Sequence, residues 1–334
     1  MKKNPLTILL LFDLSLDIKP KQYDDYWNTE EWRIEGNVRD VLVDQGHEVI
    51  ALGVHDNIDI LIQTIQKKKP DVVFNMSEAF AGKRDFEPNL VALLELLNIP
   101  YTGSGPAGLQ LCKNKGITKE ILANHEINIP KFLIAKRSHP PRNLKDFSYP
   151  AFIKPIELEA SEGISQGSFV ATEKEALDRI RFIHERLEVD AIVEEYIDGR
   201  ELYVSILGNE KLTVFPPREL FFSEVPKGQP KFATFRAKWD DQYRKKWGIR
   251  SGVAKPLPSS VEKKMGDFCK KIYRHLGIRG YGRIDLRVKE NGEIYFIEAN
   301  PNPSIAKHED FARSAAKSGL SYPELISKIL MLAF

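Results

Sequence analysis

Short apolar runs alternate with amphipathic segments through the first hundred residues of this chain. Strands are expected at 6–12, 48–54 and 71–76, and helices at 35–45, 58–68 and 90–97. Strands that alternate with helices predict a parallel α/β sheet. Ligands of such sheets bind beyond the carboxyl ends of the strands. Those ends carry Asp13, Ser77-Glu78 and a glycine/serine-rich run at 102–105.

The chain has 334 residues, which predicts two or three packed units, with boundaries at 1–112, 113–197 and 198–334. A net charge of +2 gives no sign of a nucleic-acid or membrane partner, and no apolar run is long enough to span a bilayer. The run at 6–12 is interpreted as a buried strand, because no cleavage site follows it. Cys112 and Cys269 lack motif spacing and fit a reducing cytoplasm.

The second unit is expected to hold helices at 114–124 and 174–187 and strands at 131–135, 150–154 and 191–197. Between them, residues 155–168 are rich in glycine, serine and glutamate, which indicates a mobile loop. The third unit is expected to hold strands at 200–207 and 212–215, helices at 260–276, 310–318 and 322–332, and a hairpin. The polar segment 17–32 holds four large aromatic residues and is either a substrate-side flap or a packed surface loop.

The hairpin runs from Gly280 to Pro303, and the Asn-Gly pair at 291–292 suits a two-residue type I′ turn. Counting outward from that turn places Asp285 opposite Glu298 and Arg283 opposite Asn300. Residues two apart on a strand share a face, so these four side chains are expected together.

The other face of the hairpin is expected to pack in the core. It would carry Ile284, Leu286, Val288, Tyr295 and Ile297. On the polar face two carboxylates opposite each other repel, so a cation between them is expected. Oxygen ligands suit magnesium better than zinc. An amphipathic hairpin with a solvated charged face is the alternative.

Other polar patterns precede the hairpin. Lys154 ends an apolar strand just before the glycine/serine loop, where an ammonium and free backbone N–H groups can hold phosphate, although no P-loop is present. The acidic connector 194–201 could read an adenine edge and ribose hydroxyls, and Lys238 follows. Alone, each is better explained as a surface lysine or a charged connector. Their order suggests a nucleoside triphosphate held by lysines and magnesium.

At these residues the chain resembles the ATP-grasp superfamily, and within it the D-alanine–D-alanine ligase-like branch, from about Asp71 to the C-terminus. The resemblance implies an N-terminal parallel α/β domain followed by two α+β subdomains that grip ATP. It implies two magnesium ions, with manganese as an alternative, and a homodimer. It also implies small-molecule carboxylate and amine substrates, and a cytoplasmic enzyme.

The resemblance implies three groups of ATP contacts. The lysines that contact or cover the phosphates are Lys115, Lys154 and Lys238. The loop that closes over ATP holds Ser161 and Gly163. The adenine-contacting acid is Glu194, the backbone contacts are Glu195 and Ile197, and the ribose contact is Glu201.

By the same resemblance, Asp285, Glu298 and Asn300 are magnesium ligands, with Glu298 bridging two ions. Arg283 stabilises the transferred phosphoryl group and a tetrahedral oxygen, a role worth about 3–4 kcal/mol for a single oxyanion donor. The implied reaction has two steps. ATP phosphorylates a carboxylate, which releases ADP and leaves an acyl phosphate. An amine then attacks the acyl carbon and releases phosphate.

The substrate side departs from the family pattern. The segment 12–17 lacks the family's glycine/serine/glutamate motif, and residues 77–85, which include Glu78, replace an acidic glycine-rich loop. Ser304 stands at a usual glycine, and Glu309 stands where a serine would help hold a carboxylate. Glu78, Ser304 and Glu309 are therefore the candidate substrate contacts, and D-alanine as substrate does not carry over.

Two further functions remain open at this point. One is an ATP-grasp kinase or another carboxylate-activating enzyme whose acceptor is not an amine. The other is a nucleotide-binding regulatory protein without catalysis. His308 lies near the predicted site and is better explained as a solvated loop histidine.

Overall fold

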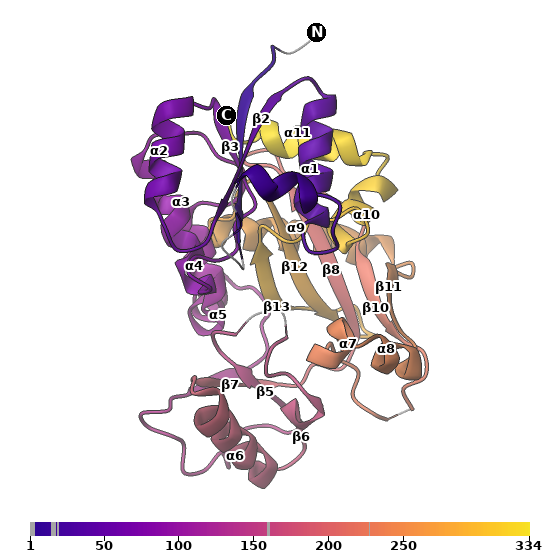
Figure 1. Ribbon diagram of the computed structural model, residues 1–334. Coiled ribbons are helices and arrows are strands. Elements are labelled where there is room, and N and C mark those ends of the chain that lie inside the picture. The colour runs from indigo at the N-terminus through magenta and orange to yellow at the C-terminus, as the bar shows by residue number, and fades with distance from the viewer. Residues whose placement is uncertain (1–3, 15–17, 19, 159–160, 227) are drawn as a thin grey trace.

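A parallel sheet in the order β2-β1-β3 forms the N-terminal part of the computed structural model, which describes residues 4–14, 18, 20–158, 161–226 and 228–334 (Figure 1). Alternate residues of β1 are buried on opposite faces, as expected of a parallel sheet covered on both sides. The elements of this part are β1 (Thr7–Asp13), α1 (Arg33–Asp44), β2 (Glu48–Val54), α2 (Asp59–Lys68), β3 (Val72–Asn75), α3 (Glu87–Leu96) and α4 (Pro106–Lys113).

A second, antiparallel sheet has the order β4-β7-β5-β6 and forms the lower lobe in Figure 1. The helix expected at 174–187 ends early, because residues 183–187 form one turn of π-helix. The elements are α5 (Lys115–Asn124), β4 (Phe132–Ala135), β5 (Ala151–Pro155), β6 (Phe169–Val170), α6 (Glu173–Phe182) and β7 (Ala191–Glu195).

The third sheet has the order β11-β10-β8-β12-β13, with the short β9 paired to β8. The apolar face of the long helix α9 packs on one side of this sheet. Its elements are β8 (Arg200–Leu207), β9 (Thr213–Val214), β10 (Arg218–Phe222), α7 (Phe235–Trp239), α8 (Asp241–Trp247), β11 (Ile249–Val253), α9 (Ser259–His275), β12 (Tyr281–Val288), β13 (Ile294–Pro301), α10 (Asp310–Lys317) and α11 (Tyr322–Met331). The unit boundaries at 112/113 and 197/198 stay predictions.

The expected two-residue turn of the hairpin is wrong. Lys289 pairs with Glu293, and Gly292 donates to the Lys289 carbonyl and has φ +84°, so the loop is longer than a type I′ turn. This shifts the pairing near the turn by one residue. A β-bulge, in which Ile297 of β13 is inserted opposite the step from Asp285 to Leu286, shifts it back, and Asp285 does pair with Glu298.

The bulge also corrects the predicted core face of β13. Ile294 and Phe296 are buried in the core, whereas Tyr295 and Ile297 are only partly buried. The prediction from strict alternation is therefore wrong for Tyr295 and Ile297. It holds for Ile284, Leu286 and Val288 on β12, where no residue is inserted.

The aromatic segment is packed against the first sheet over the part that the structure describes. Tyr23, Trp27 and Trp32 are buried around Phe12, and the Tyr23 hydroxyl accepts a hydrogen bond of 3.0 Å from the Gly53 backbone N–H. This favours the packed loop over the flap for residues 20–32. Residues 15–17 and 19 lie outside the described part of the chain.

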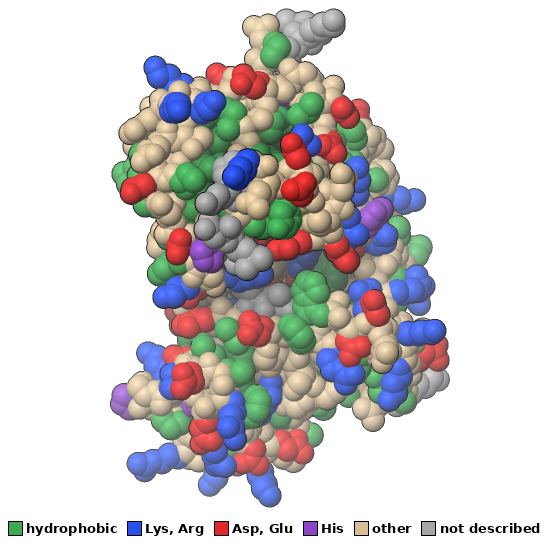
Figure 2. All heavy atoms as spheres, viewed as in Figure 1, with side chains coloured by type: hydrophobic (Ala, Val, Ile, Leu, Met, Phe, Trp, Pro, Cys, Tyr) green, Lys and Arg blue, Asp and Glu red, His purple; other side chains and the backbone are tan. Residues whose placement is uncertain are grey.

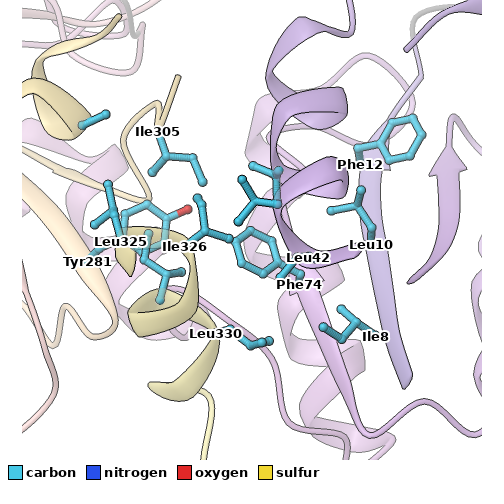
Figure 3. Close-up of a cluster of buried hydrophobic side chains, with 14 of the residues drawn as sticks. Ile8, Leu10, Phe12, Leu42, Phe74, Tyr281, Ile305, Leu325, Ile326 and Leu330 are labelled. Carbon is cyan, nitrogen blue, oxygen red and sulfur yellow. The ribbon is translucent and has the colours of Figure 1, made fainter. Parts of the chain in front are cut away.

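The two ends of the chain share one hydrophobic core. Figure 3 shows side chains from β1, α1 and β3 facing side chains from α11, with Tyr281 and Ile305 beside them. The C-terminal helices thus cover part of the N-terminal sheet. Among the described residues, no helix is long and apolar enough to cross a membrane.

Candidate active site

A cleft of about 700 Å³, counting the part open to solvent, lies between the second and third sheets. Figure 2 shows the face of the molecule hollowed at mid-height, where acidic, basic and hydrophobic side chains meet. Nine of the residues singled out from the sequence line it. They are Lys154, Ser161, Glu194, Glu195, Ile197, Glu201, Lys238, Asp285 and Glu298.

The lining divides into an apolar part and a charged part. The apolar part includes Phe152 and Phe232, whose rings meet edge to face with centroids 4.9 Å apart, and Ile297. The charged part includes Lys238 and the two hairpin carboxylates. Flat apolar walls beside cations and carboxylates match what an aromatic base linked to phosphates requires.

A buried row of charges forms the back of the cleft. The Glu194 carboxylate lies 3.3 Å from Lys119 Nζ and 3.2 Å from Lys154 Nζ. Burial lowers the pKa of Lys119 to about 8, although the Glu194 charge opposes this shift. Burial raises the pKa of Glu194, but the two lysines outweigh it and hold the pKa below its usual value. Glu194 is therefore a carboxylate held between two cations.

The hairpin presents Asp285 and Glu298 side by side. Burial raises the pKa of Asp285, and Glu298 adds to the rise. Burial also opposes the charge of Glu298, but Lys115, Lys238 and Lys154 outweigh it and lower its pKa to about 2. Glu298 is thus fully ionised at neutral pH.

Arg283 and Asn300 both contact Asp285. Arg283 donates to Asp285 Oδ1 at 2.7 Å and Oδ2 at 2.9 Å, and the Asn300 amide donates to Oδ2 at 3.2 Å. Two carboxylates and an amide oxygen fit a magnesium ion that takes its other ligands from water and phosphate. No cluster of three or more His, Cys, Asp or Glu side chains suited to a metal occurs in the described ranges.

Both Glu201 oxygens are already engaged. Tyr203 donates its hydroxyl to Oε1 at 2.8 Å, and Arg287 donates to Oε2 at 2.7 Å. Arg287 also donates to the Lys231 carbonyl at 2.6 Å, in the segment that leads to Lys238. Arg287 therefore links β12, which forms the floor of the cleft, to the segment 231–238, which covers the cleft.

The described part of the glycine/serine loop contacts the elements that cover the cleft. The Phe235 N–H donates to the Ile164 carbonyl at 3.1 Å, and Gln166 donates to the Tyr243 hydroxyl at 2.8 Å. Gly163 has φ +72°, and a Cβ there would lie 2.6 Å from the Pro155 ring. Only glycine fits this position without displacing the strand end that carries Lys154.

The remaining predicted ATP contacts lie beside the cleft lining. Lys115 donates to the carbonyls of Ile156 at 3.3 Å and Leu158 at 2.6 Å, just before the loop. Gly163, Arg283 and Asn300 do not line the cleft, although Arg283 and Asn300 contact Asp285, which does.

The candidate substrate residues lie apart from the nucleotide cleft. Glu78 is exposed, and its backbone N–H donates to Asp13 Oδ1 at 2.7 Å. Burial raises the pKa of Glu35 on α1 to about 7, and the charges of Asp13 and Glu78 add to the rise. Ser304 and Glu309 are exposed on the segment that leads into α10.

Sequence reasoning missed several residues of this site. Lys119 follows Lys115 by four residues on α5, so helical periodicity could have placed it on the same side. Arg287 follows Asp285 by two residues on β12, so strand alternation could have placed it on the polar face. The buried Tyr203 carried no signal beyond an apolar strand.

Comparisons with known proteins agree with this geometry. The family model of the D-ala D-ala ligase C-terminus matches residues 121–331. The vancomycin C-type resistance protein VanC2 of Enterococcus casseliflavus is 30% identical over 330 residues, 96% of this chain and 89% of that protein. The D-alanine–D-alanine ligase of Carboxydothermus hydrogenoformans is 28% identical over 302 residues, 87% of this chain and 89% of that protein.

The fold has solved counterparts. A structure of the D-alanine–D-alanine ligase from Bacillus anthracis complexed with ATP matches with a TM-score of 0.73 at 20% identity, covering 98% of this chain and 97% of that one. The architecture is thus the ATP-grasp fold preceded by a parallel α/β domain. The chain belongs to the D-alanine–D-alanine ligase family. It is accordingly an ATP-dependent ligase that forms C–N bonds.

Proposed function

We propose that this protein activates the carboxylate of one amino acid or small peptide with ATP and joins it to the amine of another. The observation that carries the proposal is the facing pair Asp285 and Glu298 in one cleft with Lys154 and Lys238. A carboxylate oxygen attacks the γ-phosphorus, ADP leaves, and an acyl phosphate forms. The amine then attacks the acyl carbon, phosphate leaves, and the amine nitrogen loses a proton.

The proposed roles follow from charge and position. Lys115, Lys154 and Lys238 hold the phosphates, and the loop at Ser161 and Gly163 closes over them. The base lies in the apolar part of the cleft beside Glu195 and Ile197. Glu201 receives the ribose, and for this it exchanges one of its present partners for a hydroxyl.

Glu194 has a different proposed role from the one implied by the resemblance. Both of its oxygens face lysines, so it orients Lys154 more directly than it contacts adenine. The acidic groups Asp13 and Glu78 at the carboxyl edge of the first sheet, together with Glu35 on α1, suit the ammonium of the first substrate. Ser304 and Glu309 border the second.

Asp285, Glu298 and Asn300 would hold the divalent metal, two magnesium ions or manganese. The metal would neutralise charge on the phosphates. Arg283 now binds Asp285 through two hydrogen bonds. If Asp285 instead ligated the metal, the Arg283 guanidinium would be free to stabilise oxygen that gains charge during transfer. A cytoplasmic location, a homodimer and the absence of a nucleic-acid partner are also part of this proposal.

The test is an ADP-release screen of the purified protein with magnesium and mixed pools of D- and L-amino acids and dipeptides. Mass spectrometry then identifies the product in each positive pool. A new amide with equal amounts of ADP and phosphate is the expected result. A stable phosphorylated product without an amide would point to a kinase, and ATP binding without turnover in any pool would point to a regulatory protein. Sedimentation at several concentrations tests the dimer.

A further inference from the structure

Arg179 is a partly buried cation on α6, which packs against β5 and β6, and it does not line the nucleotide cleft. Burial lowers the pKa of its guanidinium, and no carboxylate among the described residues offsets the shift. Its Nε atom is buried without a hydrogen-bond partner, and the guanidinium carbon lies 5.0 Å from the centre of the Phe182 ring. Burying a charge without a countercharge costs stability, so packing alone does not account for an arginine here.

The Arg179 guanidinium holds the described part of the glycine/serine loop, residues 161–168. Its Nη2 atom donates to the Gly163 carbonyl and to Ser168 Oγ, the latter at 3.1 Å. Ser168 Oγ in turn accepts from the Ser165 N–H at 3.2 Å, and the Ser168 N–H donates to the Ser165 carbonyl at 2.9 Å. One side chain therefore joins Gly163 to Ser168 and fastens both to α6.

The left-handed conformation of Gly163 extends this hold to the cover of the cleft. Gly163 has φ +72°, and its carbonyl accepts from Arg179. The carbonyl of the next residue, Ile164, accepts from the Phe235 N–H at 3.1 Å. Phe235 is the first residue of α7, the short helix that also carries Lys238. Two successive carbonyls thus connect Arg179 on one side and α7 on the other.

The same glycine lies against the end of β5. A Cβ at Gly163 would lie 2.6 Å from the Pro155 ring, and Pro155 directly follows Lys154. Lys154 and Lys238 both line the cleft. A displacement of Gly163 would therefore change the surroundings of both lysines, although Arg179 itself contacts neither.

We propose that Arg179 is a positioning residue for the triphosphate: it holds residues 163–168 and α7 in the arrangement that receives the phosphates, and it does not touch the nucleotide. This proposal rests on the proposed phosphate contacts and adds the residue that aligns them. A misplacement of about 1 Å in a binding group is enough for a large functional loss. Adenosine has no phosphates, so its binding should not depend on Arg179.

Calorimetry with a non-hydrolysable ATP analogue and with adenosine, each in the presence of magnesium, tests this dependence. In Arg179→Gln the Kd for the analogue should rise by about tenfold or more, the worth of one charged hydrogen bond, while the Kd for adenosine stays the same. Arg179→Lys keeps the charge and one donor, so its Kd for the analogue should lie between those of the wild type and Arg179→Gln. General damage to the second sheet would weaken both ligands alike.

Arg181→Gln is the matched control. Arg181 lies two residues further along α6, is 65% exposed, and pairs with Asp178 at 3.3 Å on the surface. Both of its Kd values should equal those of the wild type. If Arg179→Gln does not fold, Ser168→Ala replaces it, because this change removes one acceptor of Arg179 and leaves the charge. A smaller rise in the Kd for the analogue is then expected, and an unchanged Kd overturns the proposal.

Native-state hydrogen exchange without nucleotide tests the hold on the loop directly. The Ser168 and Phe235 amides should exchange faster in Arg179→Gln than in Arg181→Gln, because their acceptors lie on the loop that Arg179 fixes. Equal exchange rates, an unchanged Kd for the analogue, or equal losses for the analogue and adenosine would each overturn the role of Arg179. If the wild type binds no ATP analogue, the proposed phosphate contacts fail, and the exchange rates alone decide whether Arg179 positions the loop.

Discussion

Replacing Glu194 with glutamine should expose how the back of the cleft is stabilised. The carboxylate lies within 3.3 Å of two lysine ammonium groups whose side chains are 0% and 3% exposed. Glutamine preserves the volume but leaves both ammonium groups without a countercharge. Breaking a buried ion pair by neutralising one partner costs about 3–5 kcal/mol. We expect a loss of this size in the free energy of opening the second sheet.

The pH dependence identifies the cause. Burial sets the pKa of Lys119 at about 8 in the wild type. Without the Glu194 charge the pKa of Lys119 in the folded protein falls further, whereas its pKa in the unfolded chain stays at about 10.4. Between these two pKa values the unfolded state binds more protons than the folded state, so stability rises with pH. In Glu194→Gln this rise begins at a lower pH than in the wild type. The loss of stability relative to the wild type should therefore shrink as the pH rises towards 8 and stay constant above that.

Native-state hydrogen exchange of the β5 and β7 amides, without nucleotide, measures this local free energy. Glu293→Gln is the control, because its partner Lys289 lies at 3.4 Å on the surface, and no change in exchange is expected. The double variant Glu194→Gln, Lys119→Met removes one unpaired cation and should recover part of the loss. A deficit that is absent at neutral pH, or that does not change with pH, would refute the reasoning.

Asp285→Asn and Glu298→Gln each remove a negative oxygen from the proposed metal site, so magnesium-dependent ADP release should fall by about 100-fold or more while the hairpin stays folded. Unchanged turnover in both would eliminate the metal site. Lys154→Ala removes a charged phosphate donor and should raise the Kd for ATP, measured by calorimetry, by about 10- to 100-fold; an unaltered Kd would move the role to another lysine. Gly103 has φ +92°, and a Cβ in Gly103→Ala would lie 2.5 Å from Asn302 Oδ1. Gly46 has a similar φ of +86°, but a Cβ in Gly46→Ala would meet no atom within 4 Å. Urea unfolding should show that Gly103→Ala lowers the free energy of unfolding by about 1–3 kcal/mol more than Gly46→Ala does. Equal losses in the two variants would mean that the Asn302 side chain moves away from the new Cβ without cost.

The sequence predicted the polar face of the hairpin correctly through two errors that cancel. The predicted turn is too short, and the bulge at Ile297 was not foreseen, yet Asp285 and Glu298 face each other. Alternation specifies which residues share a face, but a bulge breaks it locally, and no residue near Ile297 signals one. The same bulge explains why Tyr295 and Ile297 were placed wrongly in the core.

The partners of residues that act through long-range contacts were not predicted from the sequence. Arg218 lies on β10, a strand that was not predicted from the sequence. Its partner Asp310 is 92 residues away along the chain. Lys119 looks like an ordinary helix surface lysine until Glu194, from another strand, is placed against it. Most residues that were picked out from contiguous motifs line the cleft, whereas residues defined by packing were not picked out.

The core in Figure 3 constrains the order in which the chain can fold during its synthesis. One face of the N-terminal sheet, at Ile8, Leu10 and Phe74, is completed by Leu325, Ile326 and Leu330 of α11, which are made long after β1. Domains generally fold from the N-terminus as they emerge. Here the first sheet can bury its other face early, but this face must wait until α11 has been synthesised. A growing chain therefore exposes an apolar surface, which a chaperone could bind, until α11 packs on it.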